Sequence, residues 1–152
     1  MDWPVAFLDF DGVLRRHQAP HGHLEPALVA NLHGVMRRVP TLHCVFSTTW
    51  RLRMGLDALR EHFAPELRAR FIGVTPELSS APPAASFREI LAWRGAAGHT
   101  GPWIAIDDQL SDFPEQCTRL CLCDPRRAFD DAAAARCTAA LVSMLHGGIR
   151  CP

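Results

Sequence analysis

The sequence predicts an α/β protein with a three-layer α/β/α, Rossmann-like fold and a mainly parallel five-stranded sheet. Short apolar runs alternate with longer amphipathic segments along the chain, as expected for strands and helices that alternate around a parallel sheet. The runs are apolar throughout, which is typical of strands buried on both faces. Acidic or hydroxyl side chains directly follow three of the runs. Because ligands of open α/β sheets bind at the carboxyl ends of the strands, this edge is the expected functional site.

Five strands and four helices are expected. The strands cover residues 4–9, 42–47, 70–74, 103–107 and 119–123, and the helices cover 25–38, 51–62, 86–95 and 130–146. In the third helix, Phe87, Ile90, Leu91 and Arg94 follow helical spacing, which predicts one buried face. Asp130 is expected to cap the last helix, and Gly147-Gly148 to end it. All 152 residues are expected to form a single domain.

Composition and charge exclude some classes of function. The formal net charge is zero, which argues against a strong non-specific nucleic-acid field but leaves room for a local basic patch. Arg15, Arg16, Arg51 and Arg53 follow the first two motifs and are expected at the rim of a pocket. No apolar run approaches membrane-spanning length, and the acidic N-terminus enters a strand too early for a signal peptide. The expected location is therefore the cytoplasm.

The cysteines are interpreted as core thiols in a reducing compartment. Cys44 lies within the second expected strand, and Cys121 and Cys123 share one face of the last. The paired Cys-x-x-Cys spacing typical of zinc sites is absent. Cys151, beside the last residue, is expected to be exposed.

The most informative motif is Asp9-Phe10-Asp11-Gly12, which ends the apolar run Val5-Ala6-Phe7-Leu8. Two carboxylates separated by one residue at a strand end open toward the same space. Bringing two such anions together costs a few kcal/mol at an effective dielectric constant of about 20. A bound cation is the usual compensation, and hard oxygen ligands suit Mg²⁺. An Asp-x-Asp near a turn is also common in plain surface loops, so the motif needs support from elsewhere.

Three further polar elements follow in order. Ser47-Thr48 comes after the second strand, where a hydroxyl could bind phosphate or simply cap the next helix. Arg88 stands near the start of the third helix, where its charge could neutralise a phosphoryl group or face solvent. Asp107-Asp108 follows the fourth strand and would complete an acidic cluster, although a turn acid and a helix cap would give the same pattern. Asp112 is a candidate for the outer part of that cluster.

In this order the motifs resemble the haloacid dehalogenase-like (HAD) hydrolase superfamily. The match extends from Val5 to Asp108, and Leu8-Asp9-Phe10-Asp11-Gly12-Val13-Leu14 is its most specific part. The run Ser47-Thr48-Thr49-Trp50-Arg51 is similar to small HAD proteins in which a Trp-Arg pair follows the second motif, some of which occur beside RNA-repair enzymes.

The resemblance implies a phosphatase and a role for each matching residue. Asp9 matches the nucleophile that forms an aspartyl-phosphate, and Asp11 the general acid/base. The expected phosphate-binding residues are Gly12, Ser47, Thr48 and Arg88. The expected Mg²⁺ ligands are Asp9, Asp11 through its backbone carbonyl, Asp107, and Asp108 as a direct or outer ligand. A phosphoryl-transfer site of this kind needs positioning and charge neutralisation more than elaborate covalent machinery.

One departure from the family's motif pattern leaves other functions possible. The family's third motif is usually a lysine, and this chain has none, so Arg88 is the candidate replacement. A HAD-fold binding or regulatory module without useful turnover is therefore the main alternative. A receiver-type signalling domain is a weaker one, because a receiver needs an adjacent acid pair after strand one and a lysine after the last strand.

The short segment between the first two strands leaves no room for a sizeable cap domain. By family analogy, an open pocket suits a large phosphorylated substrate, such as a nucleic-acid end or a phosphoprotein, and a nucleotide is a further candidate partner. His17, His21 and His23 cluster in this segment and are interpreted as a substrate-facing loop rather than a metal site. Neither the physiological substrate nor the oligomeric state follows from the sequence.

Overall fold

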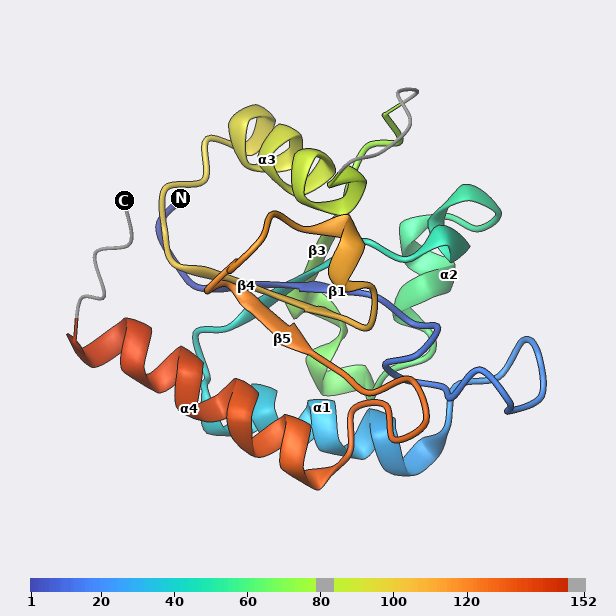
Figure 1. The fold of residues 1–152 in the computed structure, drawn as a ribbon. Helices are drawn as coiled ribbons and strands as arrows, with labels where there is room; N and C mark the ends of the chain where they lie inside the picture. The colour runs from blue at the N-terminus through green and yellow to red at the C-terminus, as the bar shows by residue number, and fades with distance from the viewer. Residues whose placement is uncertain (79–83, 148–152) are drawn as a thin grey trace.

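Five parallel strands form one sheet in the order β3-β2-β1-β4-β5 (Figure 1). The computed structural model describes residues 1–78 and 84–147. The strands are β1 (Val5–Leu8), β2 (His43–Phe46), β3 (Phe71–Val74), β4 (Trp103–Asp107) and β5 (Leu120–Leu122). The central strand β1 pairs with β2 and β4, and Leu8 lies opposite both Phe46 and Ile106. The segments that follow these three strands therefore begin side by side at the carboxyl edge.

Helices cover both faces of the sheet (Figure 1). α1 (Pro26–Arg38) and α4 (Asp131–Gly147) contact each other on one face, and α3 (Ala85–Ala97) covers the other. Along β1, Ala6 and Leu8 join the core on the α1 and α4 side, whereas Val5 and Phe7 join the core beneath α3. Because successive side chains of a strand point to opposite faces, a strand between two helix layers is apolar at every position. The predicted three-layer α/β fold is confirmed.

The strand order also excludes the receiver-type alternative. Receiver domains are built on a doubly wound sheet of order 2-1-3-4-5, whereas this chain has the Rossmann order 3-2-1-4-5. The sheet changes winding direction between β1 and β4, where Asp9 and Asp107 lie. This switch point is the expected ligand-binding position of such a sheet.

The expected helix 51–62 is wrong as a single element. The chain instead forms a 3₁₀ helix over Thr49–Leu52, then α2 over Leu56–Arg60. Gly55, with φ −75° and ψ 170°, is extended and separates the two. Further 3₁₀ helices cover Pro65–Arg70 and Leu110–Asp112.

Other local expectations are confirmed or corrected. Asp130 caps α4, because its carboxylate accepts a hydrogen bond of 2.9 Å from the N–H of Ala133. Within α3, Ile90 is fully buried, but Leu91, expected on the same face, is 42% exposed. Gly148 and Cys151 lie outside the described residues. The segment between β1 and α1 contains no cap domain, as expected. Within the described ranges, every helix is too short or too polar to cross a membrane.

Candidate active site

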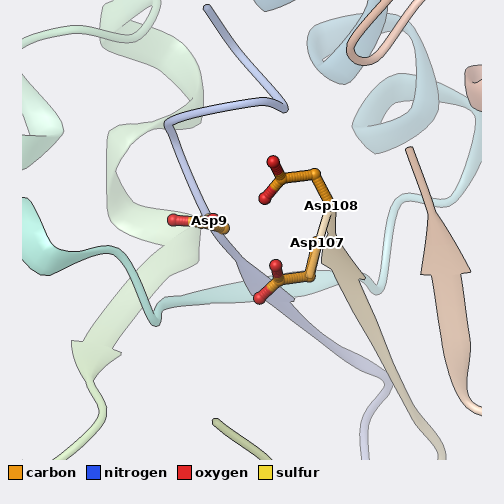
Figure 2. A group of neighbouring side chains, drawn as sticks. All are labelled: Asp9, Asp107 and Asp108. Atoms are coloured by element: carbon orange, nitrogen blue, oxygen red, sulfur yellow. The ribbon is translucent and has the colours of Figure 1, made fainter. Parts of the chain in front are cut away.

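Three carboxylates meet at the carboxyl edge of the sheet (Figure 2). Asp9 follows β1, Asp107 ends β4, and Asp108 is the next residue, so strand pairing brings together groups that are far apart in the sequence. One oxygen from each lies within 4.8 Å of the other two. The sequence predicts an acidic cluster that also includes Asp11, and the structure brings together the side chains of Asp9, Asp107 and Asp108 without that of Asp11.

The cluster is electrostatically unfavourable as it stands. Burial raises the pKa of Asp9 well above its ordinary value, and the charge of Asp107 adds to this effect. Burial also raises the pKa of Asp107 to about 7, with a further contribution from Asp108. Backbone N–H groups offset part of the cost: Phe10 donates to Asp9 and Gln109 to Asp107, over 2.8 and 2.9 Å. No arginine forms an ion pair with these three acids within residues 1–78 and 84–147.

This donor set fits a hard divalent cation. Three carboxylate oxygens with the mutual spacing of the cluster can reach one ion, and Mg²⁺ prefers oxygen ligands. A cation would also remove the repulsion and burial cost that raise the two pKa values. Asp9, Asp107 and Asp108 are therefore the side chains that could hold Mg²⁺.

Asp108 is held from two sides. Gly12 has φ +81°, a conformation that favours glycine, and a Cβ at this position would lie 2.1 Å from Oδ2 of Asp108. The same oxygen is 2.8 Å from Nε2 of His17, whose side chain is half exposed. The loop after β1 thus reaches the acidic cluster through His17. The N–H of Gly12 donates to the carbonyl of Arg15, and its phosphate-binding role stays a prediction.

Asp11 lies outside this cluster and has its own partners. Arg15 donates to Oδ1 over 2.7 Å, and the indole N–H of Trp50 donates to Oδ2 over 3.1 Å. Both partners are almost fully buried, and Trp50 packs edge-to-face on Phe10 with ring centroids 5.1 Å apart. The sequence left the role of Trp50 open; in the structure the indole packs in the core and positions the carboxylate of Asp11.

The two candidate hydroxyls differ. Thr48 is fully buried, and its hydroxyl caps the 3₁₀ helix by accepting a hydrogen bond of 3.2 Å from the N–H of Trp50. Ser47 is partly exposed and directly follows β2, and its N–H pairs with the carbonyl of Leu8. Capping therefore falls to Thr48, and Ser47 is the better placed of the two to meet a ligand.

Arg51 is not at the rim, contrary to expectation. Its guanidinium donates to the carbonyls of Ser47, Thr48 and Thr75 and pairs with Glu89 on α3. The side chain is only 6% exposed. Carbonyls at the ends of β2 and β3 have no ladder partner and need donors, which this arginine supplies. Arg51, beside the second motif, therefore has a structural role: it connects the ends of β2 and β3 to α3.

Arg88 lies in the first turn of α3, where its N–H donates to the carbonyl of Ala84. The start of this helix approaches the end of β4, since Ser86 donates to Asp112 over 3.2 Å. Asp112 is close enough for its charge to contribute to the raised pKa of Asp107, in agreement with its expected outer place in the cluster. The phosphate-binding role of Arg88 stays a prediction.

Sequence reasoning missed three contacts of the site. The pairing of Arg15 with Asp11 has a recoverable signal, because the two residues stand four positions apart after a strand end. The other two contacts join residues far apart in the sequence and leave no signal in it. His17 and Asp108 are 91 residues apart, and Trp50 and Asp11 are 39 residues apart.

The strand order, the Asp-x-Asp-Gly turn and the acidic cluster define a HAD-like domain without a large cap. A family model described as "HAD domain in Swiss Army Knife RNA repair proteins" matches residues 5–134. The chain belongs to this family. No curated protein and no solved structure matches it.

Proposed function

We propose that this protein is a Mg²⁺-dependent phosphomonoesterase that acts through an aspartyl-phosphate on Asp9. The observation that supports it best is the convergence of Asp9, Asp107 and Asp108 in one uncompensated cluster at the switch point of the sheet. Membership of a HAD family supports hydrolase chemistry of this class.

Asp9, Asp107 and Asp108 would hold the Mg²⁺, with the backbone carbonyl of Asp11 as a further expected ligand. When bound, the ion would neutralise charge between the Asp9 carboxylate and the phosphoryl oxygens. The negative charge of the cluster otherwise repels a phosphate dianion, so the metal and the substrate charge are complementary at this edge.

The reaction proceeds in two balanced steps. An oxygen of Asp9 forms a bond to phosphorus while the bond from phosphorus to the leaving oxygen breaks, and Asp11 gives its proton to that oxygen. Water then attacks the aspartyl-phosphate, Asp11 takes a proton from the water, and the bond between phosphorus and Asp9 breaks to release phosphate. Arg15 and Trp50 each donate a hydrogen bond to Asp11. To act as the acid, Asp11 must replace one of these hydrogen bonds with one to the leaving oxygen.

Ser47 and Arg88 are the proposed phosphate ligands. Ser47 follows β2, next to the end of β1 that carries Asp9. Arg88 stands on the first turn of α3, the helix whose start is tied to Asp112. Arginine retains the charge of the usual lysine but presents a planar fork, which suits phosphate oxygens.

The test is hydrolysis of para-nitrophenyl phosphate with and without Mg²⁺. We expect Mg²⁺-dependent turnover that falls at least about a thousandfold in Asp9→Asn. The matched control is Asp2→Asn, an exposed aspartate near the other end of β1, which should retain turnover. No turnover from folded protein that still binds Mg²⁺ would contradict the proposal and favour the non-catalytic module, and recovery by Arg88→Lys would then identify the missing lysine as the cause.

A further inference from the structure

A cavity of about 660 Å³ opens beside Asp11. This volume lies within the range of ordinary small-molecule sites. The acids of the metal cluster do not line it. The lining residues that matter for its chemistry are Asp11, His21, Trp50, Arg53, Met54 and His62.

Because the cavity lies beside Asp11, it is placed to hold the leaving group of the substrate. A general acid must lie within hydrogen-bond reach of the oxygen that it protonates. Under the proposed function, the phosphoryl group is held by Asp9 and the metal, and the leaving oxygen faces Asp11. The cavity that Asp11 lines therefore lies where the leaving group extends, and its walls select the substrate.

A ring and a thioether form the accessible part of the wall. His62 and Met54 are partly exposed there, and the almost fully buried indole of Trp50 supports His62 edge-to-face, with ring centroids 5.6 Å apart. Nucleobases stack on aromatic and histidine rings, largely independently of sequence. Such walls suit a nucleoside better than a flexible aliphatic alcohol.

Arg53 adds a cation at this wall. It is exposed, and its guanidinium makes no ion pair or hydrogen bond within the described ranges 1–78 and 84–147. Asp11, already paired with Arg15, is the one acid among the described lining residues. An available cation next to stacking surfaces is suited to a phosphate that adjoins a base.

A second hollow lies next to the first. It has a volume of about 340 Å³ and shares Gly22 and His62 with the larger cavity. His23 and His33 stand among its walls beside apolar side chains, and no acid lines it among the residues described. Two adjacent hollows with ring side chains in their walls can take two successive units of a chain, whereas a free mononucleotide would fill only one.

We infer that the cavity beside Asp11 binds the terminal nucleoside of a phosphorylated single-stranded nucleic-acid end, with Arg53 facing the next phosphate. This inference rests on the proposed phosphatase function and names its substrate class. The terminal phosphate lies at Asp9, the terminal base lies against His62 and Met54, and the following nucleotide extends into the second hollow.

The test compares a terminally phosphorylated decanucleotide, a nucleoside monophosphate, a phosphopeptide and para-nitrophenyl phosphate as substrates. We expect kcat/KM to be highest for the oligonucleotide. In Arg53→Ala, KM for the oligonucleotide should rise about fivefold to tenfold, with a much smaller change for para-nitrophenyl phosphate. Arg38→Ala is the control, since this exposed arginine lies in the last turn of α1 and lines neither hollow. Equal turnover of the phosphopeptide, or equal effects of Arg53→Ala on both substrates, would overturn the inference.

A binding measurement separates this inference from the proposed function. Fluorescence anisotropy of the labelled, phosphorylated oligonucleotide with Asp9→Asn requires no turnover. Arg53→Ala in that background should weaken binding and reduce its dependence on salt concentration. If para-nitrophenyl phosphate is not hydrolysed but this loss is seen, the phosphatase proposal fails and the nucleic-acid site stands. If hydrolysis is normal and oligonucleotide binding is absent, the site fails alone.

Discussion

Asp9 and Asp11 are separated by one residue but occupy opposite electrostatic environments. Asp11 is held by a buried arginine and an indole N–H. Asp9 faces two further carboxylates, and its burial raises its pKa well above the ordinary value. Phe10, between them, is fully buried and packs edge-to-face with Trp50, the residue whose indole N–H holds Asp11.

The difference indicates which charges the protein neutralises itself and which it leaves for a ligand. A carboxylate with permanent donors is fixed in position and needs no ion. The clustered carboxylates have two backbone N–H donors and the imidazole of His17, but repulsion and burial still raise the pKa values of Asp9 and Asp107. Under the proposed function, Asp11 is already fixed by its donors, whereas the side of the site at Asp9 would be completed by a cation.

The largest effect is expected from Asp11→Asn. Loss of the general acid should lower kcat on an alkyl phosphomonoester by about 10²–10⁴-fold. The loss in the first step should be much smaller on para-nitrophenyl phosphate, because nitrophenolate leaves without a proton, whereas the hydrolysis step that needs Asp11 as base is common to both substrates. Pre-steady-state release of the leaving group in the first turnover checks this. An equal loss of first-turnover rate on both substrates would assign Asp11 a positioning role instead.

Arg15→Gln should leave the carboxylate of Asp11 without its ion-pair partner. Removing one partner of a buried ion pair typically costs 3–5 kcal/mol, and we expect about 3 kcal/mol here because Asp11 is 32% exposed. For a chain of this size the melting temperature should fall by about 6–12 °C. The double variant Arg15→Gln, Asp11→Asn should recover part of the loss, and strict additivity of the two changes would exclude coupling.

Asp107→Asn should stabilise the protein when Mg²⁺ is removed. Because the pKa of Asp107 is raised to about 7 when folded, the folded state binds more protons than the unfolded state between about pH 4 and 7. Stability is therefore lost as the pH rises through this window, and the loss is complete above it. A shift of about three pKa units corresponds to about 4 kcal/mol, so the variant should gain up to about that much at pH 8 and nothing near pH 4. Thermal melts in EDTA measure this, and a gain that persists at pH 4 would point to another cause.

His17→Ala should have the smallest effect. Its imidazole occupies an oxygen of Asp108 that a cation would use, and that hydrogen bond is worth about 1 kcal/mol. We expect the Kd for Mg²⁺ to fall by about twofold to fivefold, as measured by calorimetry, with His146→Ala on α4 as a control. Weaker Mg²⁺ binding would show that His17 positions Asp108 rather than competing for it.

The layers of the fold and the acidic cluster could be predicted because they depend on local patterns. Apolar runs identify strands, and parallel pairing places Asp9 beside Asp107 at one edge. The partners of the site could not be predicted, since Trp50 reaches Asp11 across 39 residues from a 3₁₀ helix over Thr49–Leu52, whereas the local pattern predicts only a helix over 51–62. Arg51 was misplaced for a related reason, because an arginine near a motif is as well suited to strand-end carbonyls as to a ligand.

Because β1 is the central strand, the order of strand pairing determines when the site assembles. Asp9 leaves the ribosome about 100 residues before Asp107 and Asp108. β1 can pair with β2 early, but the three carboxylates meet only when β4 joins the other edge of β1. Contacts between distant segments form late in folding. The acids therefore repel one another only once most of the sheet exists, so a cation bound between them would stabilise a nearly complete fold rather than nucleate it.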